Sequence, residues 1–187
     1  MQATLNDRLA ERLKQIRIAR GWSLEVLAEK SSVSRSTLSR IENAEVSPTA
    51  ETLGSLSSAY QMSISQLLAP IETPFAALVR HGEQSLWRDA DNGFERRIVS
   101  PPSGGLSAEV VRCELEANRK ISYAAPSMPG HEHHLVVLSG ILAVTVDEET
   151  RVLEAGDCLR YRLFGPSRFQ TGDQPASYLI VLAGATS

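Results

Sequence analysis

Apolar residues recur at helical spacing over the first third of the chain. Leu5, Leu9, Leu13 and Ile16 are separated by four, four and three residues, so they form one stripe along an amphipathic helix from about residue 5 to residue 20. Four shorter groups follow, and each predicts one buried helical face: Leu24, Leu27 and Ala28; Leu38 and Ile41; Leu53 and Leu56; Ile64, Leu67 and Leu68. The sequence therefore predicts a bundle of five helices.

Residues that begin and end helices stand between these groups. Ser23, Ser34 and Thr49 can each accept a hydrogen bond from a free amide of a first helical turn. Gly21 stands where the first helix ends, at a position that favours a left-handed residue. Pro48 stops the segment before the fourth helix. The second and third helices therefore meet at a tight turn around residues 31–34.

From Ala76 onward the helical period disappears. Short β-branched or alternating stretches are separated by Gly, Pro and Asp at intervals of about ten residues, which is typical of an all-β sandwich or barrel. The predicted strands are Ala77–Arg80, Phe94–Val99, Leu106–Leu115, Leu135–Leu138, Ile141–Val146, Arg151–Leu153, Cys158–Arg162 and Tyr178–Leu182. The fold class is thus α + β in separate domains: helices over residues 1–69, a linker over 70–75 that contains Pro70 and Pro74, and strands over 76–187.

The third predicted helix carries the first candidate site. Leu38 and Ile41 face the core, which leaves Arg35, Ser36, Ser39 and Arg40 outward, with Asn43 near the helix end. Such a helix can enter the DNA major groove, where Arg pairs with guanine and Ser or Thr with several bases. The alternative is a helical hairpin with a solvated polar face.

Residues 8–68 resemble the phage-repressor-like (XRE) helix-turn-helix family. The resemblance rests on Arg17, Gly21, the segment Leu27 to Lys30, the segment Val33 to Asn43, and Ser47-Pro48-Thr49. Two positions depart from the family pattern: Leu24 replaces a Gln that contacts DNA, and Ala44 replaces a Gly at the left-handed position after Asn43.

The resemblance implies sequence-specific binding of double-stranded operator DNA by a homodimer. Two recognition helices would then lie about 34 Å apart, one turn of DNA. It also implies an ion pair between Arg17 and Glu42 that fixes the third helix. The predicted DNA contacts are Arg17, Ser34, Arg35, Ser36, Thr37, Ser39, Arg40 and Asn43.

Within the strands, residues 129–140 and 153–161 resemble the two motifs of the cupin family, whose fold is a β-barrel. The glycines and apolar residues match the family, whereas the metal ligands do not. A metal-binding cupin takes two His and one Glu from the first motif and a third His from the second. Here His133 stands at the Glu position, and Ser127 and Ser167 stand at two of the His positions.

The sequence offers a different set of histidines at His131, His133 and His134. On a strand, His131 and His133 share a face and His134 points the other way. Three hypotheses stay open for His131 and His133: a rearranged divalent-metal site, one wall of a small-molecule pocket, or polar filling at the mouth of a barrel.

Other residues could line the same pocket: Arg160, Tyr161, Ser167 and Phe169. An inward Arg160 would suit a carboxylate-bearing effector, because a guanidinium presents a fork of hydrogen-bond donors. If Arg160 faces outward, it is an ordinary solvated charge.

Composition limits the choice of partners. The 187 residues include 42% hydrophobic residues, enough for two cores, and the net charge is −3. Residues 1–69 carry +1 and residues 70–187 carry −4, so DNA binding must use a local basic patch. There is no run of eighteen apolar residues and no signal-like N-terminus, and Cys113 and Cys158 form no motif. A cytoplasmic, reduced protein with two buried thiols is expected.

These patterns together predict a DNA-binding transcriptional regulator whose cupin-like domain senses a small molecule. Two alternatives stay open. One is a metal-dependent cupin enzyme with an attached DNA-binding domain, although the changed metal ligands argue against it. The other is a regulator whose cupin domain serves only as a dimerisation scaffold.

Overall fold

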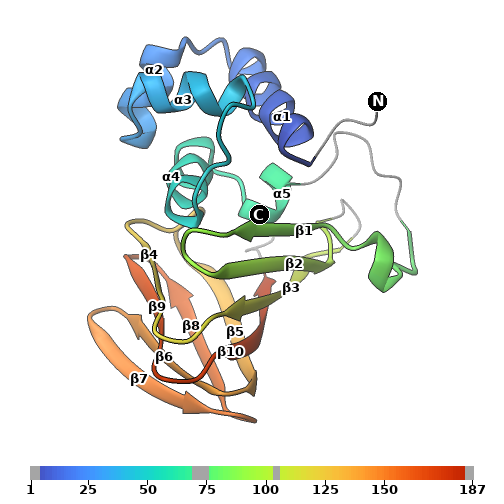
Figure 1. Ribbon diagram of the computed structural model, residues 1–187, viewed down its shortest axis with the longest axis vertical. Helices are drawn as coiled ribbons and strands as arrows, with labels where there is room; N and C mark the ends of the chain where they lie inside the picture. Colours follow the sequence, from blue (N-terminus) through green and yellow to red (C-terminus); the bar gives the residue numbers. More distant parts are fainter. Residues whose placement is uncertain (1–4, 69–75, 103–105, 184–187) are drawn as a thin grey trace.

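The computed structural model describes residues 5–68, 76–102 and 106–183. The predicted linker at 70–75 lies outside these ranges. Five helices are followed by a 3₁₀ turn and ten strands (Figure 1). The helices are α1 (Leu5–Ala19), α2 (Leu24–Ser31), α3 (Arg35–Glu42), α4 (Ala50–Tyr60) and α5 (Ile64–Leu68), and the 3₁₀ turn is η1 (His81–Glu83). All five predicted helices are thus confirmed.

Side-chain caps define where three of these helices begin. The hydroxyls of Ser23, Ser34 and Thr49 accept from the amides three residues ahead at 3.2, 3.1 and 3.1 Å, as the sequence predicts. Gly21 has φ of +67°, and Ala44 has φ of +59° where the family has glycine. A Cβ makes that conformation less favourable, so Ala44 is a mildly strained position at the end of α3.

Ten strands form two antiparallel sheets. The larger sheet has the order β1-β2-β3-β10-β5-β8 and the smaller the order β4-β9-β6-β7. The strands are β1 (Leu86–Asp89), β2 (Phe94–Ser100), β3 (Ala108–Leu115), β4 (Lys120–Tyr123), β5 (His131–Ser139), β6 (Ile141–Val146), β7 (Glu149–Glu154), β8 (Cys158–Leu163), β9 (Ser167–Thr171) and β10 (Ala176–Ala183). Among the described residues no strand pairing joins the two sheets, so the predicted barrel is a two-layered cupin-like fold rather than a closed cylinder.

Sequence pattern missed three strands and placed one wrongly. The missed strands are β1, β4 and β9, which have only four or five residues each, too few for alternation to stand out. The predicted strand Ala77–Arg80 is irregular chain before η1, because no neighbouring strand pairs with it.

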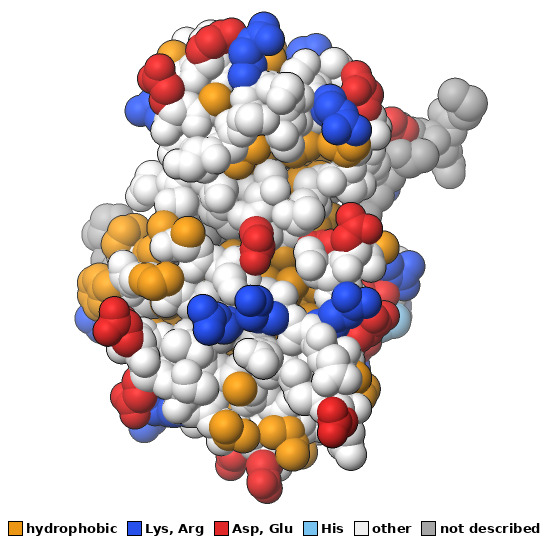
Figure 2. All heavy atoms as spheres, turned by 60° about the vertical axis from the view of Figure 1, so that its left-hand side comes forward, with side chains coloured by type: hydrophobic (Ala, Val, Ile, Leu, Met, Phe, Trp, Pro, Cys, Tyr) orange, Lys and Arg blue, Asp and Glu red, His pale blue; other side chains and the backbone are white. Residues whose placement is uncertain are grey.

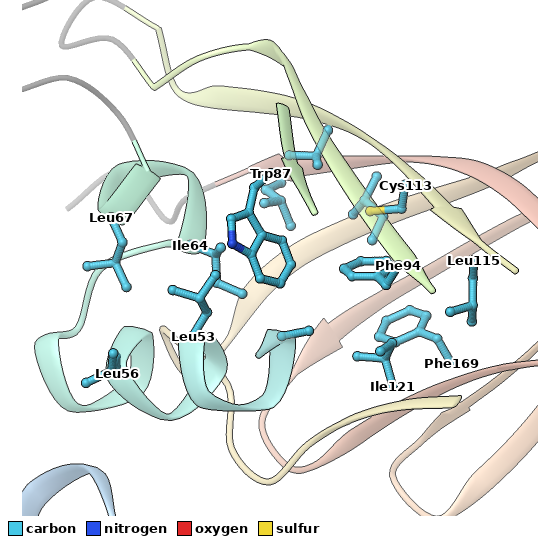
Figure 3. Packing of buried hydrophobic residues seen from close by; sticks show 14 of the residues in the cluster. Leu53, Leu56, Ile64, Leu67, Trp87, Phe94, Cys113, Leu115, Ile121 and Phe169 are labelled. Carbon is cyan, nitrogen blue, oxygen red and sulfur yellow. The ribbon is translucent and has the colours of Figure 1, made fainter. Parts of the chain in front are cut away.

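A single hydrophobic core joins the helices to the sheets. Figure 1 shows α4 and α5 between the other helices and the strands. Trp87 of β1 is 4% exposed and belongs to the same buried cluster as Leu53 of α4, Ile64 of α5 and Phe94 of β2. Figure 3 shows these four side chains together. The helical domain therefore packs against the strands in one core, although the sequence pattern predicts separate domains.

Polar contacts fix the position of α4 and α5 on the sheets. The Ala50 amide, in the first turn of α4, donates to the buried Asp89 carboxylate at 2.8 Å, an arrangement that the helix dipole favours. The Ser63 hydroxyl donates to both Glu109 oxygens at 2.8 and 3.1 Å. The hydroxyls of Ser57 and Ser127 also contact each other. Each of these contacts joins a helical residue to one in the strand domain.

No helix in the described ranges is long and apolar enough to cross a membrane.

Gly54 of α4 lies directly against the Tyr123 ring of β4. A Cβ added at Gly54 would lie 2.4 Å from Cδ1 of Tyr123 in β4, so a methyl group must push the helix or the ring aside. We expect Gly54→Ala to lower the free energy of unfolding by about 1 kcal/mol, because overpacking exceeds the helix-propensity gain of alanine. Urea denaturation would measure this change.

Gly82→Ala is the control, since a Cβ at Gly82 meets nothing within 4 Å. A Gly54→Ala variant that is more stable than wild type would contradict a tight contact between α4 and β4.

Candidate functional site

The polar face of α3 is exposed because its apolar face is anchored. Leu38 and Ile41 are 1% and 2% exposed and belong to the core. Among the predicted DNA contacts, the exposed ones are Ser34, Arg35, Ser36, Arg40 and Asn43, and the half-buried ones are Thr37 and Ser39. The structure thus places seven of the eight predicted residues at one surface.

Arg17 is the exception: it is held in an ion pair beside α3, and its role as a DNA contact stays a prediction. Its Nε and Nη2 donate to the two Glu42 carboxylate oxygens at 2.7 Å each, and its Nη1 donates to the Trp22 carbonyl at 2.8 Å. The Arg17 side chain is 13% exposed and that of Glu42 is 7% exposed. Three of the five N–H donors of this guanidinium are therefore engaged inside the helical domain. The predicted Arg17–Glu42 pair itself is confirmed, and it ties α3 to α1.

Trp22 lies against the helices rather than toward the DNA-facing surface. Its ring stacks on Tyr60 with centroids 5.5 Å apart, and Arg20 and Lys30 lie over the ring. Trp22 therefore packs as a structural residue.

The exposed arginines of α3 are held only weakly. Arg35 pairs with Glu25, and Arg40 lies 3.7 Å from Glu45. All four side chains are at least 55% exposed, so each pair contributes at most about 1 kcal/mol. Figure 2 shows positive and negative side chains interspersed over the helical half of the molecule. Both arginines can therefore leave their carboxylates for phosphates or base edges.

Removing one partner of the buried pair should loosen α3. We expect Glu42→Gln to lower the free energy of unfolding by about 3 kcal/mol, because Arg17 would keep a buried charge without a counter-charge. Chemical denaturation followed by far-UV circular dichroism would measure it. Glu45→Gln is the matched control, and it should change stability by less than about 0.5 kcal/mol because its pair is exposed. Equal losses in the two variants would mean that the Arg17–Glu42 pair does not anchor α3.

The second candidate site is a cavity of about 70 Å³ between the two sheets and the helices. It has room for roughly five water-sized groups. Strand residues, the segment 125–128 and three residues from the helical domain surround it. The helical residues are Gly54, Ser63 and Ile64, and the polar strand residues include Arg96, His131, His133 and Ser167.

His131 and His133 lie side by side at this cavity. Their ring centroids are 5.7 Å apart, and His133 Nδ1 lies 3.2 Å from the Tyr161 hydroxyl. His134 points to the other face of β5, where its Nε2 lies 2.8 Å from Glu132. The predicted orientation of the three histidines is therefore confirmed.

Burial keeps the two cavity histidines neutral. It lowers the pKa of His131, and it lowers the pKa of His133 to about 3, with smaller contributions from His131 and the positive charge of Arg96. A neutral imidazole can donate from one nitrogen and accept at the other. This wall of the cavity therefore offers hydrogen bonds without adding charge.

The donors at the cavity do not fit a divalent metal. Two imidazoles are present, but Ser127 and Ser167 occupy positions where the cupin pattern has His. No group of three or more His, Cys, Asp or Glu in the described ranges could hold a metal ion. Protein metal sites normally take at least three such ligands. The predicted metal site at His131 and His133 is therefore not assembled.

The remaining predicted pocket residues divide between the two faces of their strands. Ser167 and Phe169 line the cavity, and Tyr161 reaches it through its contact with His133. Arg160 is exposed, so its predicted role in ligand binding is wrong: in β8 it alternates with the inward Tyr161. Cys158 has the same outward parity and is exposed, whereas Cys113 is buried, which corrects the expectation of two buried thiols.

Arg96 is the cavity residue that sequence reasoning missed. It is 7% exposed and lies in β2 between Phe94 and Ile98, which are 3% exposed. A signal was present in the sequence, since an Arg at the buried parity of an alternating strand is unusual. The helical residues of the cavity wall gave no comparable signal, because nothing in the chain predicts which helix covers the sheets.

The neutral histidines make stability depend on pH. The unfolded chain binds a proton at His133 near pH 6.5, while the folded chain does not until about pH 3. The folded-state pKa is depressed, so acid favours the unfolded state. Below pH 6.5 we expect His133 to lower the free energy of unfolding by about 1 kcal/mol per pH unit. Urea titrations of wild type and His133→Gln between pH 6 and 4 would show a shallower slope for the variant.

His81→Gln, a substitution at an exposed histidine of η1, is the control and should keep the wild-type slope. Identical slopes for wild type and His133→Gln would show that His133 is not kept neutral by burial.

Comparisons with known proteins agree with this geometry. A helix-turn-helix family profile matches residues 13–67, from α1 to α5. The HTH-type transcriptional regulator SutR of Escherichia coli (strain K12) is 30% identical over 153 residues, which cover 82% of this chain and 81% of SutR. The crystal structure of an HTH_3 family transcriptional regulator from Vibrio cholerae has a TM-score of 0.78 at 24% identity, over 96% of this chain and 97% of that chain.

A Cupin_2 domain from an XRE family transcriptional regulator of Enterobacter cloacae is also similar. It matches 49% of this chain and 97% of its own length, with a TM-score of 0.47 and 18% identity.

Over nearly its whole length, the fold therefore matches that of a helix-turn-helix transcriptional regulator. The chain belongs to the family of HTH-type (XRE) transcriptional regulators, and it is similar to SutR over four fifths of its length.

Proposed function

We propose that this regulator binds operator DNA through the exposed face of α3 and that its cupin domain senses a small molecule. The observation that carries the DNA-binding proposal is the geometry of α3. Its apolar face is fixed in the core and by the Arg17–Glu42 pair, while Arg35, Ser36 and Arg40 are exposed. A helix presented in this way can place its side chains in the major groove without unfolding anything else.

The residues on and beside the outer face of α3 fall into two groups in the proposal. Arg35 and Arg40 read base edges, with guanine the preferred partner of a guanidinium. Ser36 and Thr37 lie in the first turn of α3, which is the part of a recognition helix that contacts bases. Ser34, Ser39 and Asn43 position the helix by hydrogen bonds to the phosphate backbone.

The sensing proposal rests on the cavity. An interior used only as a scaffold would be filled by side chains, whereas about 70 Å³ stays open here beside two neutral histidines and a guanidinium. Three wall residues come from α4 and α5 or their connection. A bound molecule would therefore touch the same helical bundle that presents α3. A homodimer on a pseudo-palindromic operator fits this scheme, since it places two copies of α3 one turn of DNA apart.

Arg40→Ala tests the DNA-reading face. The operator is first selected from random-sequence DNA by the wild-type protein. We expect Arg40→Ala to bind the selected site 5–150-fold more weakly, which corresponds to roughly 1–3 kcal/mol for a lost bidentate base contact. Its affinity for unrelated DNA should change less. Fluorescence anisotropy at one fixed salt concentration would measure both affinities.

Arg162→Ala is the matched control, because Arg162 is an exposed arginine on β8, far along the chain from α3. It should bind the selected site as the wild type does. If Arg40→Ala keeps the wild-type affinity and sequence preference, then α3 does not read the operator through Arg40.

A further inference from the structure

Arg96 is a buried charge that forms no ion pair with any residue in the described ranges. The residue is 7% exposed, and its Nε has no hydrogen-bond partner. Its Nη2 lies 3.5 Å from the Ser65 hydroxyl, at the long limit for a hydrogen bond. Among the described residues, no carboxylate lies within ion-pair distance of Arg96, whereas eight other arginine–carboxylate pairs form elsewhere. A guanidinium is always protonated, so the charge cannot be removed by losing a proton.

The cavity wall supplies no negative charge either. Arg96 is the one charged residue among the described residues that line it, and no Asp or Glu is present there. The buried Asp89 lies opposite Phe94, accepts from the Ala50 amide and from Asn92, and forms no ion pair with Arg96. The buried Glu109 accepts from Ser63, and its charge acts on His131 of the cavity wall. It precedes Cys113, the cross-strand partner of Arg96, by four residues, which is about 13 Å along β3. An unpaired charge in such a place is strongly unfavourable unless something binds to it.

We propose that the cavity binds a small anion, a carboxylate or tetrahedral oxyanion of about five non-hydrogen atoms, through the Arg96 guanidinium. This inference rests on the proposed sensing function and names the chemical class that is sensed. The volume of about 70 Å³ sets the size of the ligand. The free Nε of Arg96 supplies a charge-assisted hydrogen bond, and the neutral histidines and Ser167 can satisfy the remaining oxygens.

The proposed anion site adjoins the helical bundle. Ser63 and Ile64 at the start of α5 and Gly54 of α4 form one wall of the cavity, and the Ser65 hydroxyl of α5 lies 3.5 Å from Arg96 Nη2. A ligand on Arg96 therefore lies where α5 meets the sheets. If binding shifts α5, the affinities for anion and operator must change each other by the same factor.

Thermal shift and calorimetry on the full chain test the proposal. The probes are the sodium salts of acetate, propionate, sulfate and phosphate at constant ionic strength, with chloride as the reference and propionamide as the neutral counterpart of propionate. We expect at least one of the four anions to raise the Tm saturably above chloride. A response to acetate or propionate would indicate a carboxylate site, and a response to sulfate or phosphate would indicate a site for a tetrahedral oxyanion.

Variants at Arg96 test whether its guanidinium is responsible for the rise in Tm. Arg96→Met should weaken anion binding at least about tenfold, because it removes the charge and the donors while keeping a long apolar chain. Arg96→Lys keeps the charge and should retain part of the affinity. It also allows the test to be made if Arg96→Met does not fold. Arg97→Gln is the matched control: Arg97 is the next residue of β2 and has the opposite parity, so its substitution should leave anion binding unchanged.

Three results would overturn the proposal: no anion exceeds chloride in the wild type, Arg96→Met responds as the wild type does, or propionamide stabilises as well as propionate. The last result would leave a sensing cavity whose ligand is neutral, so this inference would fail while the proposed function stands. If the wild-type protein selects no operator from random-sequence DNA, the proposed function is rejected, whichever anions bind.

Discussion

Burial of α4 and α5 against the strands is the constraint on which the rest of the molecule depends. Trp87 and Phe94 on one side and Leu53 and Ile64 on the other belong to one continuous core. Asp89 and Glu109 bind α4 and the start of α5 from the sheet. The helical bundle is thereby held on the cupin domain by packed side chains, as well as by the chain that connects them. Interdomain packing of this kind transmits strain, because close-packed interiors deform little.

The helical domain uses charge in two contrasting ways. Arg17 is mostly buried and is held by Glu42 and by the Trp22 carbonyl, and it fixes α3 to α1. Arg35 and Arg40 lie on the same helix face as the exposed serines, in pairs that are weak because they are hydrated. One arginine therefore stabilises the structure, while the others stay available to a nucleic acid. A domain with a charge of only +1 can still present a local basic site in this way.

The strand domain keeps the glycines and apolar residues of the cupin pattern, but not its metal ligands. Serines stand where metal-binding cupins have histidines, and the two remaining imidazoles are neutral because they are buried. Positive charge at the cavity comes instead from Arg96 of β2, which lies outside both cupin motifs. The site is thus suited to hold an anion by hydrogen bonds, and the position of Ser63 and Ile64 in its wall gives it a direct contact with the DNA-binding part.

Local signals in the sequence determined the five helices, their caps, and the shared face of His131 and His133, whereas the Arg17–Glu42 pair was predicted from the family resemblance. These features depend on spacing along the chain, where periods of 3.6 and 2 fix which side chains lie together. Tertiary structure decided the rest. It turned Arg160 outward, brought Arg96 into the cavity, and placed residues of α4 and α5 in the cavity wall. Alternation shows that two residues share a face but not which face is buried, and that choice is made only when distant segments pack together.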